Sequence, residues 1–114
     1  MIYQIHIMDT AKTEMREIYR YIAEELNNPT AAARRISQLE SAILSLKESP
    51  ARFPLVRDDY LASKGVRSIV VKNHIVFFIV REKQRSVSIM RVMYARRDWM
   101  RLLKADAESF SNQP

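Results

Sequence analysis

The positively charged side chains of this chain are concentrated in one stretch, residues 65–103. That stretch carries nine lysines and arginines against two acids, a balance of +7. Residues 1–64 carry nine of each sign and the last eleven residues contribute −1, which accounts for the net charge of +6. Because clustered cations attract phosphates and carboxylates, this stretch predicts a polyanionic or acidic partner.

Six side chains of this stretch have types that could bind or react: Arg67, His74, Arg91, Tyr94, Arg96 and Arg97. Arginines can clamp a phosphate and stabilise its developing charge, but a pKa above about 12 makes a guanidinium a poor general base. Only His74 among the six titrates near neutral pH. The chain has no cysteine and no cluster of His, Asp and Glu at metal-ligand spacing, so we expect neither a metal nor a cofactor.

Three of these residues also have purely structural interpretations. Arg67 begins a predicted strand, where it could bond the loop that holds Asp58 and Asp59. His74 falls in a predicted turn, where a solvated hairpin residue is favoured over a catalytic acid. Arg91 has apolar neighbours on its own strand face, so it is exposed at the rim or paired, and a phosphate or a carboxylate of a partner is an equal alternative.

The residues around the last strand end have alternatives too. Tyr94 is as consistent with packing at the edge of the core as with binding. Asp98 is expected to cap the next helix and to pair with one arginine. Since one aspartate cannot satisfy both Arg96 and Arg97, one of these two should remain free for a partner. Trp99 is expected to be a core residue.

The first half of the chain predicts a short strand followed by two helices. Apolar residues favour a strand over 2–8. Spacings of three and four then predict amphipathic helices over roughly 10–27 and 29–48. The link Asn27-Asn28-Pro29 is so short that the two helices must lie antiparallel and side by side.

The second half predicts an antiparallel meander over 66–72, 75–82 and 87–94, because the separating segments suit hairpins. The helical hairpin should cover one face of this sheet, and the other face should be less covered. Residues 51–64 read as a loop, and Arg97 to Ala107 as a short docking helix. The fold class is therefore α+β, with one domain over 1–108 and a disordered tail over 109–114.

The composition narrows the class of protein. A chain of 114 residues with 47% hydrophobic residues can fold as one globular domain. We find no signal peptide and no apolar run long enough to cross a bilayer, and the absence of cysteine suits a reducing compartment. The expected location is the cytoplasm, without a membrane partner.

The order of elements, together with several local motifs, resembles the RelE/ParE family of type II toxin–antitoxin toxins. The motifs run from Ala31-Ala32-Ala33-Arg34, Leu46 to Pro50 and Phe53-Pro54 to Gly65-Val66-Arg67, Asn73 with Val76-Phe77-Phe78, and Arg91-Val92-Met93-Tyr94-Ala95-Arg96-Arg97-Asp98-Trp99 before a Leu-Leu pair. The resemblance implies a fold in which a helical hairpin packs on an antiparallel sheet. It also implies that the protein is a growth-inhibiting toxin that a cognate antitoxin neutralises. The toxin is expected to form either a homodimer by itself or a hetero-oligomer with the antitoxin.

Members of this family differ in their target. ParE-like toxins bind DNA gyrase, whereas RelE-like toxins cleave mRNA on the ribosome by turning the 2′-hydroxyl onto the adjacent phosphate. That cleavage needs a base, an acid and cations. Here His74-Ile75-Val76 stand where RelE-like ribonucleases carry an arginine, and Met93 stands where some carry a histidine. These departures favour a ParE-like binding toxin. The alternative is a ribonuclease that uses Arg67, Arg91, Tyr94 as a base-stacking platform, and Arg96 or Arg97, with His74 as an acid.

Overall fold

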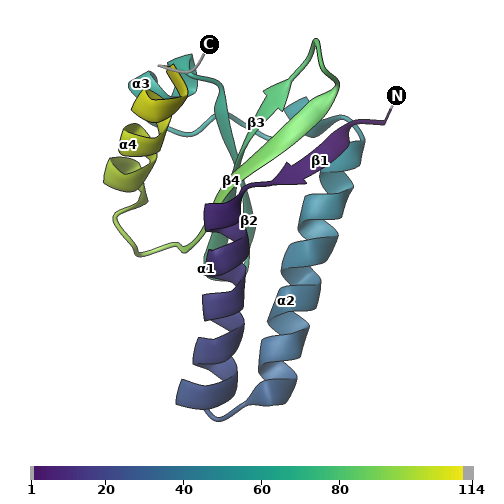
Figure 1. Ribbon diagram of the computed structural model, residues 1–114, viewed down its shortest axis with the longest axis vertical. Coiled ribbons are helices and arrows are strands. Elements are labelled where there is room, and N and C mark those ends of the chain that lie inside the picture. The colour runs from purple at the N-terminus through teal and green to yellow at the C-terminus, as the bar shows by residue number, and fades with distance from the viewer. Residues whose placement is uncertain (1, 112–114) are drawn as a thin grey trace.

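The computed structural model describes residues 2–111, with side chains for residues 2–108, and consists of a four-stranded sheet with helices on both faces (Figure 1). The strands are β1 (Gln4–Ile7), β2 (Val66–Val71), β3 (His74–Arg81) and β4 (Ser86–Tyr94). The α-helices are α1 (Asp9–Arg20), α2 (Pro29–Leu44), α3 (Asp59–Ser63) and α4 (Trp99–Ser111). No helix among these residues is long and apolar enough to cross a membrane.

The helical hairpin has the predicted form. A π-helical turn, Tyr21–Glu25, continues α1, and a 3-10 turn, Ser45–Lys47, continues α2. Asn28 caps α2 by accepting a hydrogen bond from the Ala31 N–H at 3.0 Å, with Pro29 in the first turn. The two helices lie side by side and antiparallel, as Figure 1 shows, so the prediction from the short link is confirmed.

The sheet has the order β1-β4-β3-β2 and is mixed. Strands β2, β3 and β4 form the predicted antiparallel meander, but β1 pairs with β4 in the parallel direction. The prediction of a purely antiparallel sheet is therefore wrong. The helical hairpin and the segment after it carry the chain from the β1 edge to the β2 edge. The meander then returns, and its last strand meets β1 in parallel.

Both faces of the sheet are covered. The helical hairpin packs on one face, where Leu39, Ile43, Phe78 and Ile89 are buried. The opposite face packs on α3 and α4 through a second cluster that contains Leu61, Phe77, Met90, Met93 and Leu103. The prediction that this face would be less covered is thus wrong, because α3 lies within residues 51–64, which the sequence assigned to a loop. A 3-10 turn, Pro50–Arg52, also lies there.

The carboxylate of Asp58 connects the two helices of the second face. Asp58 caps α3 by accepting from the Leu61 N–H at 2.9 Å, and it forms an ion pair with Lys104 of α4 at 3.3 Å. Trp99 stacks near Phe77 with ring centroids 5.2 Å apart, as expected for a core anchor. Helix α4 ends at Ser111, inside the segment 109–114 that was predicted to be disordered, and residues 112–114 lie outside the described residues.

Candidate functional site

A groove of about 660 Å³ lies between the helical hairpin and the adjacent ends of β3 and β4. Its walls come from α1, the π-helical turn and the first half of α2, and its floor includes Val92 and Met93 of β4. Three of the six predicted site residues line it, namely His74, Tyr94 and Arg97. A shallower hollow of about 380 Å³ beside it is lined by Arg91 and again by Arg97.

His74 is the first residue of β3 and is buried, so the prediction of a solvated turn residue is wrong. The turn lies at Lys72 and Asn73 instead. Arg35 of α2 contacts this end of the strand, and its Nη1 donates to His74 Nδ1 at 2.9 Å and to the Asn73 side-chain oxygen. Because a guanidinium only donates, Nδ1 accepts this bond and the imidazole proton lies on Nε2.

The environment of His74 disfavours its charged form. Burial lowers the pKa of His74, and the nearby Arg35 charge lowers it further, to about 4. The imidazole is therefore neutral at physiological pH. Its accepting nitrogen is already occupied, so it cannot readily receive a proton from a ligand.

Aromatic and apolar side chains line the outer part of the groove. Tyr94 is 43% exposed and packs edge-on against His74, with ring centroids 6.0 Å apart. Tyr21 and Leu26 at the tip of the hairpin are also exposed. Together they give the groove an apolar lip that a protein side chain or a flat ring can contact.

A second cluster centres on the buried carboxylate of Glu14 in α1. Its oxygens accept from Arg91 Nε at 3.0 Å, Arg91 Nη2 at 2.9 Å, the Val92 N–H at 3.0 Å and Arg97 Nη1 at 3.1 Å. Arg91 also pairs with Asp106 of α4 at 3.2 Å. The hydrogen bond with Glu14 raises the pKa of Arg91 despite its burial. Of the two alternatives for Arg91, exposed at the rim or paired, the structure therefore shows the paired one. In this cluster Arg97 is the arginine that reaches solvent, since its side chain is 49% exposed.

The remaining predicted residues lie apart from this groove. Arg67 of β2 donates to the carbonyl oxygens of Phe53 at 2.6 Å and Ala51 at 3.3 Å, and so holds the loop before α3 rather than the Asp58-Asp59 pair. Arg96 is exposed and has no ion pair among the described side chains. Asp98 caps α4 but pairs with Arg101, not with Arg96 or Arg97.

Sequence reasoning missed Glu14, Arg35 and Asn73 as parts of this site. A signal was present for two of them. Glu14 lies three residues after Ala11 and four before Ile18, and Arg35 lies three after Ala32 and four before Leu39. These positions fall on the buried stripes of their helices. A charged residue on such a stripe indicates a buried partner, which here is Arg91 for Glu14 and the β3 start for Arg35.

The groove can bind, but its described residues do not supply an acid–base pair. Glu14 has its oxygens occupied by two arginines and a backbone N–H, and His74 is neutral with its acceptor engaged. No group of three or more His, Asp and Glu residues within the described part of the chain could hold a metal ion. What the groove offers a ligand is its lip, formed by Tyr21, Leu26 and Tyr94, and the half-exposed Arg97.

Comparison with protein families gives one match. Residues 5–99 match the model of the ParE toxin of the type II toxin–antitoxin system parDE. No curated protein matches the chain.

Solved structures resemble the fold at low sequence identity. A chain of the chromosomal ParDE system from Pseudomonas aeruginosa aligns with a TM-score of 0.69 and 14% identity over 83% of this chain and 98% of its own. A chain of the toxin–antitoxin complex RelBE2 from Mycobacterium tuberculosis aligns with a TM-score of 0.59 and 20% identity over 82% of this chain and 99% of its own. A mutant form of the RelE toxin of Escherichia coli, in the free state, aligns with a TM-score of 0.59 and 16% identity over 96% of this chain and 93% of its own.

Proposed function

This chain belongs to the ParE toxin family of type II toxin–antitoxin systems, and from that membership we propose that it inhibits growth by binding an essential cellular protein. The target we infer is DNA gyrase, in the manner of ParE-like toxins. A cognate antitoxin, acidic to complement the net charge of +6, would neutralise it in the cytoplasm.

We prefer binding over catalysis because none of the candidate side chains is in a protonation and hydrogen-bonding state that suits a general acid or base. Cleavage of RNA through its 2′-hydroxyl requires a group that accepts the hydroxyl proton. His74 has a pKa of about 4 and an occupied acceptor nitrogen. Arg91 is paired with Glu14 and Asp106. Removal of a general acid or base typically lowers the rate about 10²- to 10⁴-fold, so the remaining arginines and tyrosine support binding better than turnover.

One observation favours the alternative, a RelE-like ribosome-dependent mRNA endoribonuclease. Tyr94, Arg97 and His74 line one groove, and the exposed Arg96 lies next to Arg97 in sequence. A tyrosine that stacks on a base and arginines that bind a phosphate are elements of an RNA site. In this alternative Tyr94 and Arg97 would be the residues that contact RNA.

The antitoxin contact that we propose uses the half-exposed Arg97, the exposed Arg96 and the apolar lip at Tyr94. Arg91 is a weaker candidate than the sequence indicated, because its guanidinium is already paired inside the protein. Arg67 is likewise engaged with two backbone carbonyls.

Two assays run in parallel on the purified chain test the proposal. We expect inhibition of gyrase supercoiling and no site-specific cleavage of mRNA on programmed ribosomes. The variant Lys83→Gln, which removes an exposed charge far from the groove in a β-turn, serves as a matched control for Arg97→Gln and should behave as wild type. Site-specific mRNA cleavage that is lost in Tyr94→Ala and Arg97→Gln, but kept in Lys83→Gln, would replace the gyrase proposal with the ribonuclease.

A further inference from the structure

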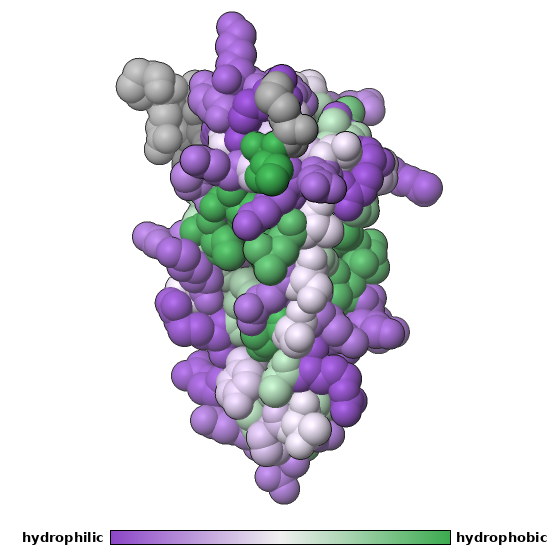
Figure 2. Space-filling view, turned by 90° about the vertical axis from the view of Figure 1, so that its right-hand side faces the viewer, coloured by the Kyte–Doolittle hydropathy of each residue, from purple (hydrophilic) through white to green (hydrophobic). Residues whose placement is uncertain are grey.

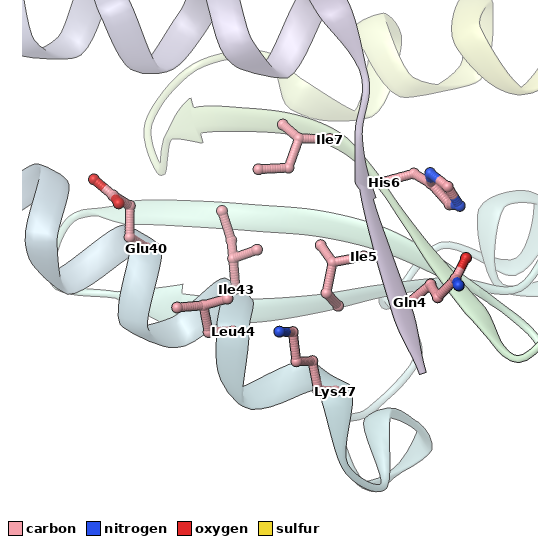
Figure 3. Close-up of a pocket in the computed structure, with 8 residues that line it drawn as sticks. All are labelled: Gln4, Ile5, His6, Ile7, Glu40, Ile43, Leu44 and Lys47. Atoms are coloured by element: carbon pink, nitrogen blue, oxygen red, sulfur yellow. The ribbon is translucent and has the colours of Figure 1, made fainter. Parts of the chain in front are cut away.

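A second groove, unrelated to the candidate site, lies between β1 and the C-terminal half of α2 and has a volume of about 470 Å³ (Figure 3). Ile5 and Ile7 of β1 point across it toward Ile43 and Leu44 of α2. Leu44 is 54% exposed at its mouth. Figure 2 shows apolar surface on this side of the molecule, in the half that carries β1. An apolar surface of this kind favours a protein partner.

The edge of β1 beside this groove has unpaired backbone groups. The N–H groups of Gln4 and Met8 donate to Arg85 and Ile89, at 2.8 and 3.0 Å, on the β4 side. Since alternate residues of a strand point to opposite edges, the N–H and C=O groups of Ile5 and Ile7 face away from β4. The Lys47 carbonyl accepts from the Tyr3 N–H at 2.8 Å and closes only the beginning of this edge. No other described strand pairs with β1.

The charges at the rim of the groove have opposite signs. Glu40 and Lys47 are both exposed, lie seven residues apart on either side of Leu44, and form no ion pair among the described side chains. Seven residues of helix span about 10 Å. If a second α2 lies antiparallel across Leu44, each Glu40 faces the other copy's Lys47. A patch that complements itself in this way fits a two-fold symmetric contact.

We propose that this face joins two copies of the chain in a symmetric homodimer. The β1 strands pair antiparallel through Ile5 and Ile7, Leu44 packs against its symmetry mate, and Glu40 pairs with Lys47 across the two-fold axis. A second copy fits better than a uniformly acidic partner, because such a partner would place negative charge against Glu40. The proposal does not depend on which cellular target the protein has.

Sedimentation equilibrium of the purified chain over a range of concentrations tests this inference. We expect reversible association to twice the monomer mass of 13.4 kDa. Leu44→Asp should abolish it, because the charge would be buried at the centre of the contact. Leu55→Asp, which alters another exposed leucine remote from the groove, should still dimerise. Melting temperatures establish that each variant is folded.

A charge exchange provides the sharper test. Glu40→Lys and Lys47→Glu should each weaken the dimer by about tenfold, since like charges then meet across the axis. The double variant restores opposite charges and should dimerise within about threefold of wild type. A chain that stays monomeric at all concentrations would overturn the proposal, as would a dimer that is insensitive to Leu44→Asp. If the monomeric chain instead loses antitoxin affinity in Leu44→Asp, the groove belongs to the antitoxin and the homodimer is wrong.

Discussion

At the scale of single residues, the carboxylate of Glu14 organises the charges around the candidate site. It binds Arg91, the Val92 N–H and Arg97 at once, and thereby joins α1 to β4 and to the segment before α4. A buried ion pair need not stabilise a protein relative to apolar residues, but removal of one member leaves an uncompensated charge. Replacement of Glu14 should therefore destabilise the folded protein strongly.

We predict that Glu14→Ala lowers the free energy of unfolding by about 3–5 kcal/mol, because Arg91 then stays buried with only Asp106 as an ionic partner. Denaturant titration measures this change. Arg101→Ala, which removes the exposed partner of Asp98, is the matched control and should cost about 1 kcal/mol or less. Equal losses for the two variants would mean that the Glu14 cluster is solvated in solution.

The neutral state of His74 predicts a pH dependence of stability. Its pKa is about 4 in the folded protein against 6.5 in the unfolded chain, so the unfolded state binds more protons between these values. Stability from this residue is fully present above about pH 6.5 and is lost as the pH falls toward 4. Since one pKa unit corresponds to about 1.4 kcal/mol, the loss could reach about 3 kcal/mol.

Comparison with His74→Gln isolates this effect from the titration of the acids. Glutamine can still accept a hydrogen bond from Arg35, but it does not titrate. We expect the unfolding free energy of wild type to fall more steeply than that of the variant between pH 6.5 and 4. Parallel curves across this range would mean that His74 protonates in the folded protein near its ordinary pKa.

At the scale of elements, the buried stripe of α2 attaches the helical hairpin to the sheet. Leu39 and Ile43 pack against Phe78 and Ile89 in the first core cluster. We predict that Leu39→Ala costs about 2–5 kcal/mol, because it removes a fully buried side chain and leaves a cavity. Leu26→Ala, at an exposed position of the hairpin tip, should cost well under half as much. Equilibrium unfolding of both variants distinguishes a packed stripe from a loosely attached hairpin.

The elements that sequence could predict are those set by local patterns. Three-four spacing marks both long helices, and the cap at Asn28 with Pro29 sets the start of α2. The hairpin connections mark the meander. The parallel pairing of β1 with β4 and the coverage of the second face could not be predicted in this way. Both depend on where distant segments meet, and α3 is five residues long, with little periodicity to detect.

The candidate site depends even more on contacts between distant segments, which sequence patterns do not reveal. His74, Tyr94 and Arg97 were identified by residue type, and they line one groove. Their partners come from α1 and α2, so the pairing of Arg91 with Glu14 and of His74 with Arg35 is a tertiary result. Sequence indicated which arginines could bind an anion, but not which were already occupied inside the protein.

At the scale of the whole molecule, charge is unevenly distributed along the chain. The balance of +7 in residues 65–103 is reduced locally where Glu14 and Asp106 pair with Arg91 and Arg97. The exposed Arg96 and the half-exposed Arg97 remain near the groove. Complementary charge mainly raises the rate of association, and salt screens that effect over about 10 Å at 0.1 M.

We therefore predict that the association rate with a purified cognate antitoxin falls by about tenfold or more as the ionic strength rises tenfold, while the dissociation rate changes little. Stopped-flow mixing measures both rates. The double variant Arg96→Gln, Arg97→Gln should flatten this salt dependence, because it removes the exposed cations nearest the groove. The double variant Arg57→Gln, Lys83→Gln removes the same charge at exposed positions away from the groove and should retain most of the salt slope. If both double variants flatten the slope equally, the net charge steers association, and the position of the arginines does not matter.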